Sequence, residues 1–427
     1  MLEDADHSLI ERDPELQGLA VLLDAERLDA ALRSCMKVEP DQATTISYLR
    51  YKPGVNCIAR FRFGDREGYA KAFGTGEEGK IAKALQASEE GHSVSPAIRL
   101  PDDPVICRFF PRDARLSALS RLASDQTRQA MFERIFKDDP SWRDARFHTL
   151  NYKPERRFVA RLDHVDGRRA TLKLFSEREF SATRRSRKKL NLPQGLRLPD
   201  WIGGSKALRA LAFDWLPGQT LEAQLRLGRV DGVRQAGSAI ARLHSSEQPA
   251  LGKRRQMPRH EVIATLSRQL IHLAPDLRQS IGQVAEGLLA WTESLDPERR
   301  PVHGDFYAQQ VILGSDTVGV IDMDSAHLGD PMDDLGCFVA QLERQVVRGT
   351  IARSDLDRAR SALLDGHAMD HADLSHDGLD FFVAYQLLKL APRPFRDREP
   401  RWHTQINRLL QRSIALLAGE GIEEMRP

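Results

Sequence analysis

Apolar residues recur at helical spacing through most of the second half of the chain. From residue 229 onward these runs predict a series of helices whose charged residues lie on the opposite faces. The helices are predicted over 233–244, 259–274, 278–295, 334–348, 354–369, 378–391 and 402–418. A further helix is predicted near the N-terminus, over 15–36, where leucines at helical spacing oppose charged residues.

The first half of the chain contains strand-like runs instead, and these occur as a repeat. Residues 48–73 and 149–175 share Tyr-Lys-Pro followed by Ala-Arg, at a constant offset of 101 residues. After one inserted residue Lys71 matches Lys173, and both lysines fall late in a third predicted strand. The two stretches therefore predict the same strand, turn, strand, hairpin, strand order.

The similarity continues beyond the third strand. Each stretch runs into a charged helix, over 76–90 and 177–190, and then into two further strands. We therefore predict that 44–119 and 147–225 are two versions of one small antiparallel β-domain with a single helix. The residues between them, 120–146, are predicted to be a helical connector.

Two aspartates end short apolar runs in the later part of the chain. Val302 predicts one strand, and Val311–Leu313 with Val318–Ile321 predict a hairpin after it. Asp305 and Asp322 lie where these runs stop, so the fold can hold two carboxylates in one place. One carboxylate can accept a proton from a hydroxyl, and the other can hold a hard divalent cation on phosphate oxygens. This pair suits phosphoryl transfer.

Composition limits the class of protein. A length of 427 residues predicts two or three domains. Lys plus Arg at 63 against Asp plus Glu at 61 argues against nucleic acid as a partner. The N-terminus is acidic and polar, unlike a secretory signal, and no apolar run approaches the roughly 18 residues that span a membrane. The four cysteines are scattered, which favours reduced thiols and a cytoplasmic location.

Five motifs occur in a fixed order over the second half of the chain. They are Phe213–Gly218 (FDWLPG), Ala241–His244 (ARLH), His303–Asp305 (HGD), Ile321–Asp324 (IDMD), and Gly329–Pro331 (GDP) followed by Asp334-Leu335. In this order they resemble the aminoglycoside phosphotransferase family, which is similar to choline kinases and more distantly to protein kinases. The resemblance covers roughly 147–400. It implies an α+β, two-lobed, protein kinase-like fold.

With the repeat, this resemblance predicts three domains. Residues 1–146 contain a degenerate duplicate of the kinase small lobe, 147–220 form the small lobe itself, and 221–427 form the helical catalytic lobe. The FDWLPG segment resembles the hinge of the family, which implies nucleotide contacts at Asp214 and Leu216.

The resemblance also implies roles for the acidic motifs and for one lysine. Asp305 stands in the position of the catalytic base that orients and deprotonates the acceptor hydroxyl. Asp322 stands in the position of the Mg²⁺ ligand, and Asp324 either assists it or only hydrogen-bonds the loop. Lys173 is expected to reach the α- and β-phosphates of ATP. His303 is expected to hold the loop backbone.

One departure from the family concerns the metal site. The family places Asn five residues after the catalytic aspartate, and Gln310 stands there instead. Its carbonyl oxygen is on a longer arm but remains a ligand for a hard cation. Maltokinase-like members of the superfamily are similar in having Gln at this position.

Two more departures concern the nucleotide. The turn Tyr152–Arg157, which is expected to cover the phosphates, has no glycine, so Arg156 and Arg157 are either phosphate contacts or solvated charges. The helix after Lys173 is expected to carry its paired Glu, and either Glu179 serves or the pair is absent. The basic run RRSRKK in that helix favours a solvated face over a nucleic-acid site.

The first stretch has its own lysine but no catalytic motifs after it. Lys71 has a partner-like Glu78, and we expect 1–146 to be non-catalytic. Near the C-terminus, Tyr385, Gln386, Arg393 and Arg396 resemble a stretch that recurs in the family, facing either cleft or core. Asp365 and Asp370 suit an amine-bearing substrate, although surface acids are the better interpretation.

The sequence therefore predicts an ATP- and Mg²⁺-dependent kinase of a small molecule. Its acceptor would be a hydroxyl of a sugar, aminosugar or amino alcohol, and neither a membrane nor a nucleic acid is expected as a partner; a homodimer is allowed. One alternative is a nucleotide-binding pseudokinase with a regulatory or scaffolding role. A protein kinase is less favoured, because the segment between Asp322 and the GDP turn is too short to dock a peptide.

Overall fold

The computed structural model describes residues 2–37, 41–89, 97–186, 191–248, 251, 257–292, 299–314, 317–371 and 376–419. The chain divides into two compact units. Unit 1 contains Met1–Ser181, Asp200–Trp215 and Pro394–Arg401, and unit 2 contains Ala182–Pro199, Leu216–Arg393 and Trp402–Pro427. None of the helices in the described part of the chain has the length and apolar character needed to cross a membrane.

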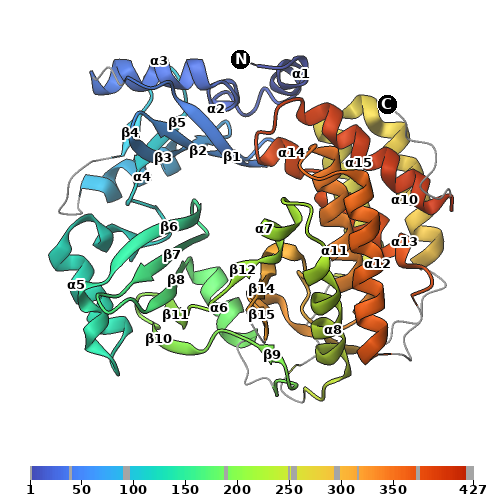
Figure 1. The fold of residues 1–427 in the computed structure, drawn as a ribbon. Coiled ribbons are helices and arrows are strands. Elements are labelled where there is room, and N and C mark those ends of the chain that lie inside the picture. Colours follow the sequence, from blue (N-terminus) through green and yellow to red (C-terminus); the bar gives the residue numbers. More distant parts are fainter. Residues whose placement is uncertain are drawn as a thin grey trace. The chain divides into compact units, whose positions relative to one another are not determined.

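Unit 1 contains two five-stranded antiparallel sheets with the same strand order (Figure 1). The first sheet has the order β1-β2-β3-β5-β4, and the second has the order β6-β7-β8-β11-β10. The strands of the first are β1 Thr45–Lys52, β2 Asn56–Phe63, β3 Arg66–Phe73, β4 Ile98–Arg99 and β5 Val105–Phe109. Those of the second are β6 Arg146–Lys153, β7 Arg157–Asp163, β8 Arg169–Phe175, β10 Trp201–Ser205 and β11 Ala210–Asp214.

The two lysines of the repeat occupy the same place in their sheets. Lys71 on β3 pairs with Ile58 and Ile106, and Lys173 on β8 pairs with Val159 and Leu211. A helix follows the lysine strand in both cases, α4 Glu78–Glu89 after β3 and α6 Glu177–Ser186 after β8. The register therefore agrees with the match of Lys71 to Lys173.

The likeness extends further upstream than the sequence analysis predicted. Ahead of the first sheet lie α1 Asp4–Arg12, α2 Leu19–Leu23 and α3 Ala25–Met36, and ahead of the second lie the 3₁₀ helix η1 Leu119–Ala123, α5 Asp125–Ile135 and η2 Pro140–Asp144. At an offset of 100, Leu16, Leu19 and Leu22 match Leu116, Leu119 and Leu122, and all six are buried. The predicted connector is thus the counterpart of the N-terminal helices. We call 12–109 the first repeat and 112–214 the second repeat.

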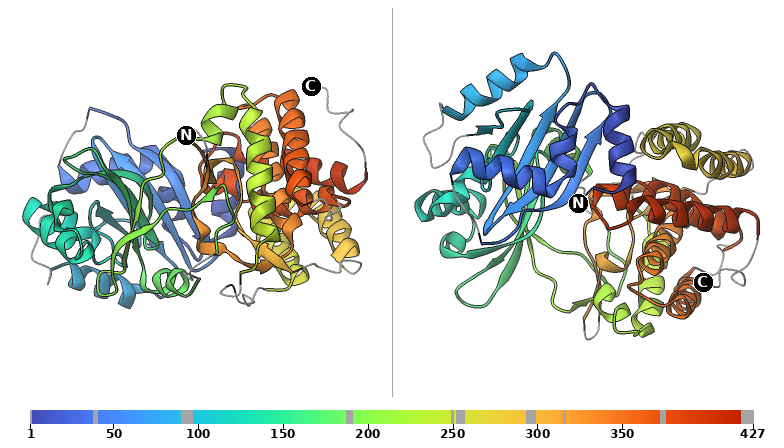
Figure 2. Two further views of the ribbon diagram at one scale, coloured as in Figure 1. Left: turned by 60° about the horizontal axis from the view of Figure 1, so that its bottom comes forward. Right: turned by 90° about the horizontal axis from the view of Figure 1, so that it is seen from above.

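The single helix predicted over 15–36 is wrong, because Asp24 interrupts it. The Asp24 carboxylate accepts hydrogen bonds from the backbone N–H groups of Glu26 and Arg27, at 2.9 and 3.5 Å, and so caps α3. Ser124 caps α5 at the matching position of the second repeat. A side-chain acceptor that satisfies the first N–H groups of a helix favours a new helix start there. In the first repeat, α2 packs against β2 and β3, and the right-hand view of Figure 2 shows α3 over the same sheet.

Unit 2 consists mainly of helices, and most lie within three residues of the predicted bounds. They are α7 Leu221–Leu225, α8 Asp231–Ser245, α9 Arg259–Leu273, η3 Pro275–Leu277, α10 Arg278–Thr292, α11 Pro331–Val347, α12 Arg353–Asp370, α13 Leu379–Leu390 and α15 Trp402–Leu417. The short α14, Arg393–Arg396, spans the boundary between the units. Strand pairs form beside them: β12 Gln219–Thr220, β14 Val311–Leu313, β15 Val318–Val320 and β9 Leu196–Arg197 in one sheet, and β13 Arg300–Val302 with β16 His327–Gly329 in another.

Helix α11 is the central element of unit 2. Fourteen of its residues, including Glu343, are buried. Glu343 accepts from Arg412 on α15 at 2.9 Å and from Arg353 on α12 at 2.7 Å, which satisfies a carboxylate that would otherwise be costly to bury. A Cβ on Gly336 would lie 2.7 Å from that of Phe382, so only glycine allows α13 to approach this closely. A rigid α11 provides a fixed base for the loops at its N-terminus.

Candidate active site

Two loops of unit 2 carry the predicted catalytic residues, and Ile321 fastens them together. The first loop follows β13 and contains Asp305, and the second follows β15 and contains Asp322. Strands β14 and β15 pair Val311 with Val320. Beyond this pair the N–H of Ile321 donates to the carbonyl of Gln310 at 2.9 Å. The hairpin therefore holds the ends of both loops side by side.

His303 completes the link between the loops. Its Nδ1 accepts from the backbone N–H of Asp305 at 3.2 Å, so the ring proton is on Nε2 and is donated to the carbonyl of Ile321 at 2.9 Å. Gly304 has a φ of 79°, and a Cβ there would lie 2.6 Å from the carbonyl oxygen of Ser325. The loops are thus packed too closely for any residue but glycine. The structural role predicted for His303 is confirmed.

The carboxylate of Asp334, on α11, holds the backbone of the first loop. It accepts from the N–H groups of His303 and Gly304 at 2.7 and 2.8 Å, and from Nε2 of His244 at 3.1 Å. Asp334 is fully buried; burial alone opposes its charge, but the hydrogen bonds from His244 and the loop outweigh it, so its pKa is lowered. Asp330 caps α11 through the N–H of Met332 at 3.0 Å. Asp334 therefore braces the catalytic loop, and Asp330 fixes the start of the helix that carries Asp334.

A row of three histidines continues from Asp334. His244 Nδ1 lies 3.1 Å from His367 Nε2, and His367 Nδ1 lies 3.1 Å from His376 Nε2. Because Asp334 can only accept, His244 donates to it from Nε2. Rings that each donate from Nε2 and accept at Nδ1 satisfy every contact along the row. Burial lowers the pKa of His367 to about 3, and the neighbouring histidines add to the shift.

We expect this row to make the protein sensitive to acid. Below pH 6.5 the unfolded chain takes up a proton at His367, whereas the folded protein does so only near pH 3. The contribution of His367 to the free energy of unfolding is therefore complete above pH 6.5 and falls as the pH falls through this window. At pH 5 this residue alone lowers the free energy of unfolding by about 2 kcal/mol. Urea unfolding at pH 7 and pH 5 measures the loss. His367→Gln should remove about that much of the pH dependence, and an unchanged difference would contradict the assignment.

Tyr307 is a site residue that the sequence analysis missed. Burial raises its pKa to about 12, with Asp305 and Asp322 adding to the shift and Arg393 opposing it. The phenol is therefore close enough to sense both carboxylates and one arginine. Its hydroxyl accepts from Nε2 of Gln310 at 3.1 Å. The only sequence signal was its place two residues after the aspartate of the HGD motif.

The predicted metal ligands Gln310, Asp322 and Asp324 lie on these same two loops. Gln310 is 6% exposed, and because its nitrogen donates to Tyr307, its oxygen is the atom suited to a cation. Asp322 has a φ of 64°, a strained value for a residue with a side chain. Within the described residues no group of three or more His, Cys, Asp or Glu could hold a metal by itself. Oxygen donors in this number suit Mg²⁺, which usually completes its shell with water and phosphate.

The predicted nucleotide contacts of unit 1 lie on the second repeat. Arg156, in the turn between β6 and β7, forms an ion pair with Glu179 on α6 at 2.5 Å. Arg157 begins β7 beside it. Lys173 on β8 has its Nζ 5.6 Å from the centre of the Phe213 ring. Glu179 thus contacts an arginine of the turn, which the sequence analysis did not foresee.

The predicted hinge coincides with the point where the chain leaves unit 1, between Trp215 and Leu216. Asp214 is the last residue of β11, and its carboxylate accepts from the N–H of Asp200 at 2.5 Å. Leu216 is buried in unit 2, where a Cβ on Gly319 would meet its Cδ1 at 2.6 Å. Both side chains therefore help to fix the conformation of this segment.

The lysine of the first repeat has a different partner from the one predicted. Lys71 Nζ contacts both carboxylate oxygens of Glu155, at 2.9 and 3.0 Å, rather than Glu78. Glu155 belongs to the β6–β7 turn of the second repeat. Arg50 donates to the same carboxylate at 3.1 Å. The predicted pairing of Lys71 with Glu78 is therefore wrong, because the buried carboxylate of Glu155, from the other repeat, occupies the lysine instead.

The remaining sequence candidates lie in the core or on the surface. Tyr385 and Gln386 are buried within α13, so they face the core of unit 2. Asp365 pairs with Arg234 at 2.7 Å, and Asp370 with Arg242 at 3.2 Å, on the exposed side of α8 and α12. These aspartates are surface acids, as the sequence favoured. The side chains of the basic run RRSRKK, residues 184–189, lie outside the described residues.

Comparison with known proteins identifies a family. The model of the phosphotransferase enzyme family (APH) matches residues 140–370, which is more than half of the chain. The match begins just before β6, so it includes the catalytic loops and leaves out the first repeat. None of the curated proteins matches the chain.

Two solved structures of phosphotransferases are similar to this chain to different degrees. A thermostable mutant of aminoglycoside phosphotransferase APH(4)-Ia, in ternary complex with ADP and hygromycin B, is 14% identical, with 70% of this chain and 100% of that chain covered and a TM-score of 0.50. Spectinomycin phosphotransferase APH(9)-Ia, in complex with ADP and spectinomycin, is 12% identical, with 64% of this chain and 92% of that chain covered and a TM-score of 0.40. The α+β, kinase-like fold predicted from the motifs is confirmed.

Proposed function

The chain belongs to the phosphotransferase enzyme family, and from this premise we propose that it transfers the γ-phosphate of ATP to a hydroxyl of a sugar, aminosugar or amino alcohol. The observation that carries the proposal is the pair of loops tied together by His303, Ile321 and Asp334. These bonds fix the backbone on which Asp305 and Asp322 stand. Because phosphoryl transfer depends on positioning and charge neutralisation, a fixed pair of carboxylates is the feature it needs.

Asp305 acts as the catalytic base in this proposal. Its carboxylate orients the acceptor hydroxyl and takes up its proton as the oxygen attacks the γ-phosphate. The backbone N–H of Asp305 is held by His303, which sets the direction of the loop at this residue. Tyr307, whose pKa is raised by the charge of Asp305 and lowered by that of Arg393, lies near the same carboxylate and limits the room available to the acceptor.

Asp322 and the side-chain oxygen of Gln310 hold Mg²⁺, with Asp324 as a third candidate. The donor set supports this assignment, since all are oxygens on two loops joined by hydrogen bonds. When bound with ATP, the cation neutralises charge on the β- and γ-phosphates. The longer arm of Gln310 is held by Tyr307, which compensates for the extra methylene relative to Asn.

Lys173, Arg156 and Arg157 contact the phosphates from the second repeat, and the backbone at Asp214 and Leu216 contacts the base. The complexes of APH(4)-Ia and APH(9)-Ia with ADP support a nucleotide of this kind. Hygromycin B and spectinomycin, bound by those two proteins, support a small hydroxylated acceptor.

A screen for ADP release tests the proposal. The full chain is incubated with ATP, Mg²⁺ and panels of hexoses, aminosugars and amino alcohols, with Asp305→Asn in parallel. We expect at least one panel to stimulate ADP release by the wild type but not by the variant. A thermal shift with ATP and Mg²⁺ but no turnover would favour a nucleotide-binding pseudokinase. The absence of both turnover and a thermal shift would contradict the proposal.

A further inference from the structure

We propose that the first repeat holds the β6–β7 turn of the second repeat in place, so that Glu155 and Lys71 are positioning residues for nucleotide binding. The turn, residues 152–157, is the segment expected to cover the phosphates, so the inference rests on the proposed function. It assigns a purpose to the first repeat, which lies outside the family match at 140–370.

The two repeats build this turn in the same way. In the first repeat the Tyr51 hydroxyl and the Gly54 N–H donate to the carboxylate of Asp13, at 2.6 and 3.0 Å. In the second, the Tyr152 hydroxyl and the Glu155 N–H donate to the carboxylate of Asp113, at 2.8 and 2.7 Å. The backbone hydrogen bonds of the two turns also agree. The N–H of Val55 donates to the carbonyl of Lys52 at 3.1 Å, and the N–H of Arg156 donates to the carbonyl of Lys153 at 3.0 Å. These bonds set the local conformation of the turn, and the Glu155 side chain takes no part in them. That side chain is therefore available to attach the turn to another part of unit 1.

Glu155 stands where this turn favours glycine. Gly54 has a φ of 64°, and Glu155 has a φ of 59° at the equivalent position. Glycine adopts this left-handed conformation freely, whereas a residue with a side chain is strained in it. A glutamate in this place is therefore unfavourable for the turn itself. The contacts of its side chain have to offset this backbone strain.

The side chain of Glu155 enters a group of three cations, two of which belong to the first repeat. It is 2% exposed, and its carboxylate contacts Lys71 at 2.9 Å, Arg50 at 3.1 Å and Arg115 at 3.5 Å. Lys71 and Arg50 belong to β3 and β1 of the first repeat, and Arg115 to the segment before η1. Removing one partner of such a buried group leaves an uncompensated charge. The lysine that matches Lys173 is thus used for an internal carboxylate.

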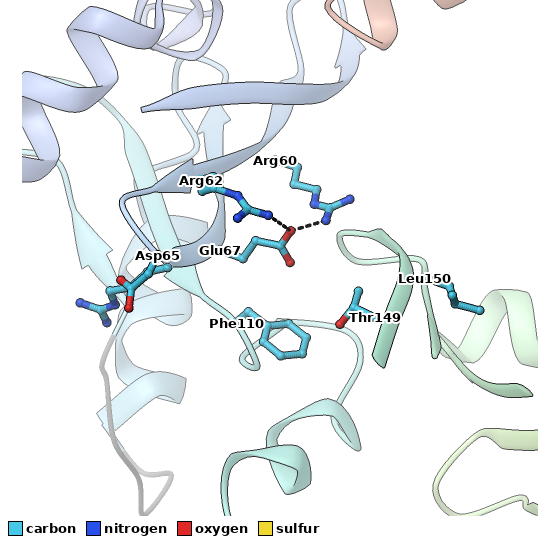
Figure 3. A pocket seen from close by; sticks show the side chains of 8 residues that line it. Arg60, Arg62, Asp65, Glu67, Phe110, Thr149 and Leu150 are labelled. Atoms are coloured by element: carbon cyan, nitrogen blue, oxygen red, sulfur yellow. Dashed lines mark hydrogen bonds and ion pairs between the residues drawn. The ribbon is translucent and has the colours of Figure 1, made fainter. Parts of the chain in front are cut away.

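A second contact from the first repeat reaches the same turn. Arg60 on β2 donates to the carbonyl of Tyr152 at 3.4 Å, and its guanidinium lies 5.8 Å from the centre of the Tyr152 ring. Arg60 also pairs with Glu67 at the wall of a cavity of about 560 Å³, which Thr149 of β6 lines from the other side (Figure 3). The first repeat therefore contacts the turn at both its backbone and its side chain.

The far side of the turn is tied to α6 by the ion pair of Arg156 with Glu179. The chain between β6 and β7 is thus held in two directions, by the first repeat through Glu155 and by α6 through Arg156. A glycine-rich turn is free to fold down on phosphates when they arrive. This turn is instead held before ATP binds, so the nucleotide does not have to order it.

Nucleotide affinity and amide exchange of the turn test the proposal. Glu155→Gly introduces the glycine that the first repeat has at the equivalent position, Gly54, and keeps the same backbone conformation. Lys71→Met removes the nearest cation of the Glu155 carboxylate. We expect both variants to weaken binding of ATP with Mg²⁺ about tenfold and to speed hydrogen exchange at residues 153–158 by a similar factor. The kcat at saturating ATP should stay within about twofold, since the base and metal loops are untouched. Lys71→Arg should restore most of the affinity.

Lys80→Met is the matched control, because that lysine pairs with Glu77 on an exposed part of the same repeat. It should change neither quantity. Unchanged affinity in Glu155→Gly and Lys71→Met, or a loss in kcat instead of affinity, would overturn the inference. Absence of nucleotide binding by the wild type would overturn the proposed function instead, so the two failures are distinct. Glu155→Gly keeps the test valid if Lys71→Met fails to fold, because glycine relieves the strain at this φ.

Discussion

Replacement of Asp305 by Asn is expected to lower kcat about 10³-fold while the affinity for ATP stays within about twofold. The reason is that a general base contributes roughly 10²- to 10⁴-fold, and that the amide of Asn cannot take up the hydroxyl proton. The fold should persist, since the contact of this residue that fixes the loop is made by its backbone N–H to His303. Coupled ADP release measures kcat, and calorimetry measures ATP binding.

The surface variant Asp365→Asn serves as the control for the loss of a negative charge. Asp365 pairs with Arg234, and both side chains are about half exposed, so this pair contributes little. We expect Asp365→Asn to keep the kcat and the ATP affinity of the wild type. A fall of less than tenfold in Asp305→Asn would show that another group takes the proton, and Asp305 would then be only an orienting residue.

The elements and the acidic loops could be predicted because their signals are local. The helices of unit 2 show a clear period in their apolar residues, and α8 to α13 and α15 lie close to the predicted bounds. The motifs around Asp305 and Asp322 identified the family because their order along the chain is specific. The repeat of the Tyr-Lys-Pro motif predicted the same succession of strands twice in unit 1, and the two sheets do share one strand order.

What could not be predicted depends on contacts between distant segments. The partner of Lys71 lies 84 residues away in the other repeat, and no local pattern distinguishes Glu155 from Glu78. The break at Asp24 depends on a carboxylate that serves equally well on the polar face of a helix or as its cap. The upstream part of the repeat was missed because only buried leucines and one aspartate, Asp13 or Asp113, persist in it.

The row of histidines shows the same limit for the active site. His244 and His367 are 123 residues apart, and they meet because α8 and α12 cross closely. A Cβ on Gly237 would lie 2.2 Å from the carbonyl oxygen of Leu363, so this crossing requires glycine. Sequence identified His244 as the end of a family motif, but the chain of bonds that starts at Asp334 required the three-dimensional arrangement.

Replacement of Asp334 by Ala is expected to destabilise unit 2 and to slow the reaction. The change leaves the N–H groups of His303 and Gly304 and the imidazole of His244 without their acceptor, all of them buried or partly buried. Loss of one partner from such a group costs about 3–5 kcal/mol. Release of the loop that carries Asp305 should also lower kcat about 10²-fold, because a small displacement of a catalytic group has a large effect on rate. Urea unfolding and ADP release measure the two effects.

Two further variants separate the role of the Asp334 carboxylate from a general loss of acid. Asp276 also bonds a histidine, His403, at 2.9 Å, but it is 63% exposed, so Asp276→Asn should change neither stability nor kcat. Asp334→Asn keeps the volume but places an NH₂ group among donors, so it should lie between wild type and Asp334→Ala. If Asp334→Ala were folded and kept its kcat within threefold, the loop would be fixed by His303 and Ile321 alone. The buried carboxylate would then serve only the folding of unit 2.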